Sequence, residues 1–203
     1  MQKIWKFIQA VLGLGLLALA ITVLIAADGP DPWGLLILAF YRHLPLSLGV
    51  TTQIGGLILI LLNLFWGRRR PGLATFMSMI LVGLFIDIIQ SLAGGTIAGM
   101  PELPLLAAGI IIMALGISIY VKAGLGEGPV EGMMFVLSDK LGISIGSAKV
   151  IQDLSFVFLG CLLGQFPKWG TLVTALGVGP LTQGLMRISD LTREMKKAPE
   201  APK

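Results

Sequence analysis

The sequence predicts an all-α polytopic membrane protein built from two three-span repeats, each with one additional short helix. Three observations lead to this fold class. Apolar residues make up 55% of the 203 residues and charged residues only 13%, with a mean hydropathy of +0.89, which is typical of a membrane protein rather than a soluble domain. The apolar residues gather in long runs. The chain also repeats itself at a fixed spacing, which indicates a duplicated architecture.

Six apolar runs approach or exceed the roughly 20 residues that a spanning helix needs. They are Ile4–Ala27, Val50–Trp66, Leu73–Leu92, Leu103–Val121, Ile145–Phe166 and Thr171–Ile188. Lys3 and Lys6 precede the apolar stretch Ile8–Ala27 of the first run, as in a signal peptide, but this stretch is too long for the apolar core of one, so we expect a retained span. Two further runs, Trp33–Tyr41 and Val130–Leu137, are too short to cross alone. Each follows a Gly-Pro turn, with Pro32 or Pro129 at the expected first helical position.

The repeat is carried by glycine, proline and serine. The turn Gly29–Pro32 recurs as Gly126–Pro129, and the stretch Leu-Pro-Leu-Ser-Leu-Gly ending at Gly49 recurs as Leu-Gly-Ile-Ser-Ile-Gly ending at Gly146, 97 residues later in both cases. The repeat divides the chain into a first membrane repeat at residues 1–95, a second at residues 96–188 and a polar tail at residues 189–203. Internal repeats in a membrane protein commonly build a site at their interface.

The basic residues indicate whether the short runs cross. If all eight runs cross, five of the 15 Lys and Arg residues lie outside, including Arg68–Arg70. If each short run enters and leaves on the same side, only Arg42 and Lys168 lie outside. The positive-inside rule favours the second arrangement. Each repeat then crosses three times, so the second repeat is inverted relative to the first, and both termini are cytoplasmic.

The two Gly-Pro turns are candidate substrate-binding elements. A helix N-terminus exposes unpaired N–H groups and a partial positive charge, and non-helical backbone at membrane depth survives only where it is buried or lines a cavity. The candidate residues of the turns are Asp31, Pro32, Gly126, Gly128, Pro129 and Glu131. Ordinary capping is the alternative for the acidic residues, because Asp31 can cap one short helix and Glu131 can complement the dipole of the other.

Polar residues within the long runs complete the candidate site, since ionisable groups in spans are costly and face a cavity or a partner. They are Asp87, its repeat equivalent Gln183, and the neighbours Gln152 and Asp153. Asp87 has no basic residue near it in sequence, so it is the best candidate to bind a cation or a proton. A hydrogen bond to Ser or Thr on a neighbouring helix is the alternative. We expect Asp153 to pair with Lys149, one turn earlier.

Several stretches resemble the YczE/YitT-type bacterial integral membrane proteins. They are Ala123–Pro129, Gly142–Gly146, Gly170-Thr171, Gly179-Pro180 and Gly83–Asp87. The resemblance extends over about residues 8–188 and implies a multi-pass protein of the bacterial cytoplasmic membrane with no established chemistry. One departure is Glu131, since such proteins often carry an aspartate after the second Gly-Pro turn. The chain shows no C-terminal soluble regulatory domain of the kind that some YitT-type members carry.

These observations favour a secondary transporter or permease for an unidentified small molecule, with its site between the repeats. The alternative is a non-transporting membrane factor that assists an export or biosynthetic partner, and a passive channel comes third. We do not expect an enzyme, a metal or a cofactor, because the chain has one histidine, His43, and one cysteine, Cys161, and lacks a nucleophile–base set. The expected partners are the lipid bilayer and a small molecule, not nucleic acid, and a homodimer is an allowed assembly.

Overall fold

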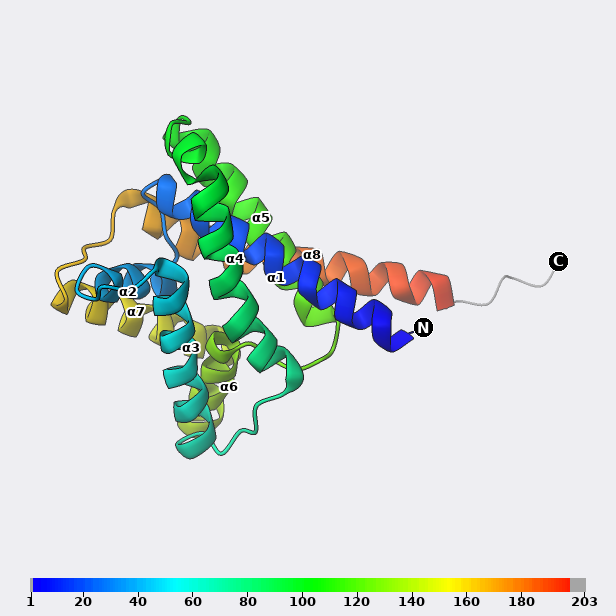
Figure 1. The fold of residues 1–203 in the computed structure, drawn as a ribbon. Helices are drawn as coiled ribbons and strands as arrows, with labels where there is room; N and C mark the ends of the chain where they lie inside the picture. Colours follow the sequence, from blue (N-terminus) through cyan, green and yellow to red (C-terminus); the bar gives the residue numbers. More distant parts are fainter. Residues whose placement is uncertain (1, 198–203) are drawn as a thin grey trace.

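The computed structural model describes residues 2–197 and folds them into helices joined by short loops (Figure 1). The helices are α1 Gln2–Ala26, α2 Pro32–Tyr41, α3 Leu48–Phe65, α4 Leu73–Ala98, α5 Glu102–Lys122, α6 Pro129–Leu141, α7 Ile145–Leu162 and α8 Trp169–Lys197. No strand occurs in this part of the chain. Every apolar run of the sequence lies largely within a helix, so the all-α prediction is confirmed.

Four helices, α1, α3, α4 and α5, are long and apolar enough to cross a membrane. A fifth span is obtained if α6 and α7 count together, as a pair bent by 116°. The sequence led us to expect six spans. The difference lies in α7, whose segment Gly146–Leu162 counts only together with α6, and in α8, which is long but is made less apolar by Pro180, Gln183 and several Gly and Thr residues. Helix α8 also continues to Lys197, so the first part of the expected tail is helical, and residues 198–203 lie outside the described part.

Helices α1 and α5 run antiparallel along most of their lengths. Near the start of α1, the Gln9 side chain donates a hydrogen bond to the Ile119 carbonyl near the end of α5, 3.0 Å away. Near the end of α1, Leu24 packs against Gly109 in the first half of α5. Helices α1 and α5 are therefore oppositely directed neighbours. Helix α4 packs on α1, and α8 packs on α5.

Two close approaches between helices depend on glycine. A Cβ atom on Gly116 of α5 would lie 2.8 Å from the backbone nitrogen of Leu17 and 2.9 Å from the carbonyl of Gly13, both in α1. A Cβ atom on Gly49 of α3 would lie 2.0 Å from the Gly83 carbonyl in α4. Small residues allow such backbone contacts between membrane helices. These two crossings join α1 to α5 and α3 to α4.

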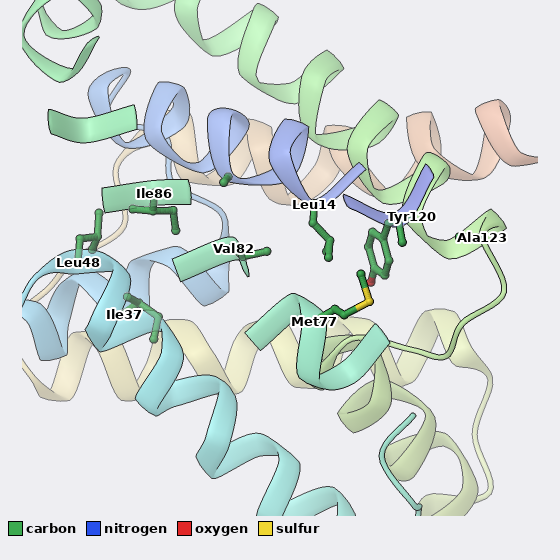
Figure 2. Close-up of a cluster of buried hydrophobic side chains, with 10 residues drawn as sticks. Leu14, Ile37, Leu48, Met77, Val82, Ile86, Tyr120 and Ala123 are labelled. Carbon is green, nitrogen blue, oxygen red and sulfur yellow. The ribbon is translucent and has the colours of Figure 1, made fainter. Parts of the chain in front are cut away.

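The remaining contacts place the short helices between the long ones. Helix α2 packs against α3 and more extensively against α7, and α6 packs against both α3 and α7. The main core cluster gathers side chains from α1 to α5 and the residue after α5, and Figure 2 shows Tyr120 and Met77 pointing toward each other within it. The labelled members are Leu14, Ile37, Leu48, Met77, Val82, Ile86, Tyr120 and Ala123. This core fixes α4 and α5 on either side of the turn that precedes α6.

Candidate functional site

The turn between α5 and α6 bends at Gly124 and Gly126, whose φ angles of +65° and +119° favour glycine. Gly128 is the N-cap of α6, and Pro129 is its first residue, as the sequence predicts. A Cβ atom on Gly128 would lie 2.3 Å from Oε2 of Glu131 and 3.0 Å from the Tyr120 hydroxyl, so the Glu131 side chain would have to shift to admit one. Glycine thus permits the backbone conformation of the turn at Gly124 and Gly126 and the close packing at Gly128.

The same turn docks on the start of α4. The backbone N–H of Ala74 donates to the Leu125 carbonyl at 3.0 Å. The Thr75 hydroxyl donates to the Glu127 carbonyl at 2.6 Å and accepts a hydrogen bond from the Gly72 N–H at 3.0 Å. The turn is therefore held by main-chain and hydroxyl contacts to a helix of the first repeat.

Arg69, in the loop before α4, ties this region together electrostatically. Its guanidinium contacts the Glu127 carboxylate at 2.8 Å and the Asp139 carboxylate at 3.3 Å. It also lies 4.9 Å from the centre of the Phe135 ring, within the range of a cation–π contact. All three partners belong to the second repeat, so Arg69 links the two repeats.

A pocket of about 230 Å³ opens between these elements. Its walls come from the end of α3, the loop before α4, the start of α4, the second Gly-Pro turn and α6. The lining residues are Ile60, Asn63, Arg69, Arg70, Pro71, Gly72, Thr75, Gly126, Glu127, Gly128 and Gly132. Two arginines, a carboxylate, an amide and a hydroxyl make this a polar pocket that can bind a small molecule. In the described part of the chain, no three His, Cys, Asp or Glu residues are grouped to hold a metal ion.

Two buried amides hold the first turn of α6. Asn63 of α3 donates from Nδ2 to the Pro129 carbonyl at 2.9 Å, and Gln152 of α7 donates from Nε2 to the Val130 carbonyl at 2.8 Å. Asn63 is 6% exposed and Gln152 is 1% exposed, yet the oxygen of each amide has no hydrogen-bond partner. An unsatisfied buried acceptor costs about 1–3 kcal/mol. The two oxygens are therefore acceptors open to a water molecule, an ion or a ligand.

The first Gly-Pro turn docks on the start of α8 in a similar way. The Thr174 hydroxyl donates to the Gly29 carbonyl at 2.8 Å, and a Cβ atom on Gly170 would lie 2.8 Å from the Cα of Gly29. Lys168, just before α8, forms an ion pair with Asp28 at 2.5 Å. The first turn is thus tied to α8, as the second turn is tied to α4.

Asp31 caps α2, because its Oδ1 accepts a hydrogen bond from the Gly34 N–H at 3.2 Å, and Pro32 is the first residue of that helix. The capping prediction is confirmed. Asp31 lies within electrostatic reach of Lys149 and Asp153, which form the expected ion pair with each other. In this loop between α1 and α2, burial raises the pKa of the Asp31 carboxyl to about 6, while the positive charge of Lys149 opposes the rise.

Asp87 lies on α4 and contacts the start of α3. Its Oδ2 accepts a hydrogen bond from the Ser47 hydroxyl at 2.5 Å, and its Oδ1 accepts one from the Gly49 N–H at 2.8 Å. Ser47 is the N-cap of α3. A carboxylate is favourable at a helix N-terminus. Gln183, the repeat equivalent of Asp87, is exposed on α8, and no hydrogen bond of its side chain is found in the described residues.

The structure therefore places the predicted site residues in separate groups. Those at the second turn are Gly126, Gly128, Pro129, Glu131 and Gln152, and those at the first turn are Asp31, Pro32 and Asp153. Asp87 belongs to the contact between α3 and α4, and Gln183 stands apart from both turns. The two turns are the centres of the candidate site.

Sequence reasoning missed five residues that line the pocket with polar side chains, which are Asn63, Arg69, Arg70, Thr75 and Glu127. Asn63 was detectable, since it is a polar residue within the apolar run that forms α3. The arginines were considered only as markers of membrane orientation. Nothing local in the sequence indicates that Arg69 reaches Glu127, because 58 residues separate them.

Comparison with known proteins agrees with this architecture. Residues 4–187 match a family of unknown function, DUF6198. The chain belongs to this family. It is 26% identical over 177 residues to the uncharacterized membrane protein YczE of Bacillus subtilis, covering 86% of this chain and 81% of that protein. The expected resemblance to YczE-type membrane proteins is thus confirmed.

Two further relatives cover most of the chain. An uncharacterized protein of Haemophilus influenzae is 26% identical over 188 residues, which are 92% of this chain and 83% of that protein. The uncharacterized protein YyaS of Bacillus subtilis is 22% identical over 187 residues, which are 90% and 93% of the two chains. No solved structure matches the chain. The comparisons establish a membrane protein of this family and leave its activity to be inferred from the site.

Proposed function

We propose that this multi-pass membrane protein is a secondary transporter or permease for a small molecule, with two inverted halves and a binding site between them. The first half is α1 to α4, and the second half is α5 to α8. The observation that carries the proposal is the reciprocal docking of the Gly-Pro turns. The first turn packs on α8 of the second half, and the second turn packs on α4 of the first half.

The helix contacts support a two-fold relation between the halves. Exchanging α1 with α5, α2 with α6, α3 with α7 and α4 with α8 converts the α1–α4 contact into α5–α8, α2–α7 into α6–α3, and α2–α3 into α6–α7. The equivalent helices α1 and α5 are antiparallel neighbours. Two equivalent spans that run antiparallel favour inverted halves, which is the arrangement that the basic residues also favour.

The two halves differ in one contact. Helix α3 packs on α4 through Gly49, Gly83 and Asp87, whereas no comparably extensive contact joins α7 to α8 within residues 2–197. The N-terminus of α3 is therefore held by Asp87, and its equivalent in the second half is not held by Gln183. The proposed role of Asp87 in binding a cation or a proton stays a prediction.

Two ion-paired contacts are suited to act as gates. Arg69 joins the halves at the second turn through Glu127, and Lys168 joins them at the first turn through Asp28. With inverted halves, the first contact lies at the cytoplasmic face and the second at the outer face. Exposed ion pairs contribute only about 0–1 kcal/mol each, so they can open without large cost. We propose that alternating access opens one contact while the other stays closed.

The orientation in the proposal places both termini in the cytoplasm of a bacterial cell and the protein in the cytoplasmic membrane. The start of α1 and the end of α8 point to the same end of the molecule (Figure 1), which supports termini on one side. Arg68–Arg70 then lie at the inner face, where basic residues are favoured.

Counterflow in proteoliposomes tests the proposal. Proteoliposomes that contain the purified protein are loaded with a pool of unlabelled amino acids, of carboxylates or of amines. The uptake of labelled members of the same pool is then followed. We expect one pool to be exchanged, with Asp87→Asn reducing exchange or removing its pH dependence. Absence of exchange from all pools would contradict transport, and a stoichiometric protein that co-purifies would then favour the non-transporting alternative.

A further inference from the structure

We propose that the pocket at the second turn binds a small zwitterion, in which an anionic group meets Arg70 and an N–H donor a few bonds away meets Asn63. An amino acid has this chemistry. The inference names the ligand class for the pocket of the proposed function, and it rests on that proposal only for the way in which the pocket opens.

The anionic half of the ligand is indicated by the arginines. Arg70 lines the pocket and is exposed, and the structure shows no ion pair or hydrogen bond of its side chain in the described part of the chain. The charge of Arg69 is already shared by Glu127 and Asp139. Arg70 is thus the cation available to a ligand, and a guanidinium binds a carboxylate through two parallel hydrogen bonds.

The donor half is indicated by the buried amide of Asn63. Its Nδ2 must face the Pro129 carbonyl, because the opposite orientation would bring two acceptors together. Oδ1 is therefore the free end of the amide, and it is buried without a partner. It needs an N–H or O–H donor. Once the Arg69–Glu127 contact opens, the Glu127 carboxylate in the same wall favours a positively charged donor such as an ammonium group.

The size of the pocket limits the ligand. A volume of about 230 Å³ lies below the range of about 300–1,000 Å³ that is usual for pockets of drug-sized ligands. The pocket therefore suits a small ligand such as a small amino acid.

Arg69 lies next to Asn63 in the wall of the pocket. Its backbone N–H donates to the Asn63 carbonyl at 3.0 Å, and its guanidinium contacts Glu127. Oδ1 of Asn63 is fully covered in this arrangement. A ligand therefore reaches the amide as the Arg69–Glu127 contact opens, and the donor that it supplies satisfies an acceptor that is otherwise unpaired.

The same chemistry occurs in a lipid. The headgroup of phosphatidylethanolamine carries an anionic phosphate and an ammonium with N–H donors, whereas phosphatidylcholine has no N–H. The bilayer can thus supply the ligand as well as the aqueous phase, and the two sources are separated by the choice of lipid in the test.

Binding to the full-length protein in nanodiscs tests the inference. In phosphatidylcholine nanodiscs, calorimetric titration compares glycine, L-alanine and L-serine with trimethylglycine, propionate and ethylamine. We expect at least one amino acid to bind, and expect each compound that lacks the N–H donor or the anionic group to bind at least about tenfold more weakly. Stabilisation seen only in phosphatidylethanolamine nanodiscs, and dependent on Arg70, would support the same chemistry with a lipid headgroup as the source.

Two variants and one control assign the contacts. Arg70→Gln should weaken binding about tenfold. Arg68→Gln, in the same loop but outside the pocket lining, should leave binding unchanged. Asn63→Ala should remove the preference for the amino acid over trimethylglycine. If Asn63→Ala does not fold, the comparison of the two ligands on the native chain still tests the donor half.

The inference is overturned if neither the amino acids nor phosphatidylethanolamine bind, if trimethylglycine binds as tightly as the amino acid, or if Arg70→Gln and Arg68→Gln behave alike. A different result would contradict the proposed transport function. Specific binding of an amino acid without counterflow of that amino acid would contradict the proposed function and leave this ligand class supported.

Discussion

Asp87 shows how a single residue in a span takes its role from a partner far along the chain. Its two carboxylate oxygens accept hydrogen bonds from Ser47 and Gly49 at the start of α3, about 40 residues away. The sequence alternatives for Asp87 were a cation or proton site and a hydrogen bond to a neighbouring helix. The hydrogen bonds to a neighbouring helix are present. A cation or proton that binds Asp87 would therefore have to act on this contact with α3.

Replacing Asp87 should loosen the start of α3. Asp87→Ala removes the acceptor for a hydroxyl and for a backbone N–H at a helix N-terminus, so we expect a loss of about 1 kcal/mol of stability. Thermal unfolding of the purified protein in detergent measures the effect. Gln183→Ala is the matched control at the equivalent position of α8, and an equal loss in this control would show that Asp87 has no special role.

At the scale of helices, the fold depends on close approaches and on paired contacts between the halves. Gly116 brings α5 against α1, and the two Gly-Pro turns bring loops of one half onto helices of the other. These contacts decide how the halves sit against each other. These contacts can be perturbed one at a time, because the chain also has glycines such as Gly95, where an added Cβ atom would meet no other atom and which serve as controls.

Adding a methyl group at the α1–α5 crossing should push these helices apart. Gly116→Ala places a Cβ atom 2.8 Å from the Leu17 nitrogen, and overpacking of this kind costs about 1–3 kcal/mol. In contrast, Gly95→Ala in α4 meets no atom within 4 Å and should be neutral or stabilising by up to about 1 kcal/mol. Thermal unfolding of both variants measures the difference, and equal stability would refute the crossing.

Reversing charges at the first turn should separate a gating role from a structural one. Lys168→Asp alone should impair counterflow by repulsion from Asp28, and combining it with Asp28→Lys should restore activity. Stability should change by less than about 1 kcal/mol in each variant, since the pair is exposed. Arg42→Glu, in another exposed loop, should have little effect. Failure of the double reversal to recover activity would count against the gate.

The sequence predicts elements whose signals are local and misses contacts whose partners are distant. The apolar runs, Pro32 and Pro129 at helix starts, the Asp31 cap and the Lys149–Asp153 pair all lie within short stretches, and the structure contains them. The pocket depends on Arg69 meeting Glu127, 58 residues away. Such a contact follows from the packing of α3, α4 and α6, which no single stretch encodes.

At the scale of the whole molecule, duplication and asymmetry occur together. The helix contacts of one half largely repeat in the other, and the polar groups do not. The second turn has Arg69, Glu127 and a pocket with Asn63, while the first turn has Asp28, Lys168 and the Asp31 cap. A transporter built on this plan would bind its substrate close to the second turn and use the first turn chiefly as the opposite gate.

Inversion of the two halves is the central claim, and cysteine accessibility tests it most directly. In a Cys161→Ser background, Arg68→Cys reports on the loop before α4, and Phe166→Cys reports on the loop before α8. A membrane-impermeant thiol reagent applied to intact cells should label Phe166→Cys, and Arg68→Cys should react only after permeabilisation. Labelling of both positions from the same side of the membrane would contradict the inverted arrangement.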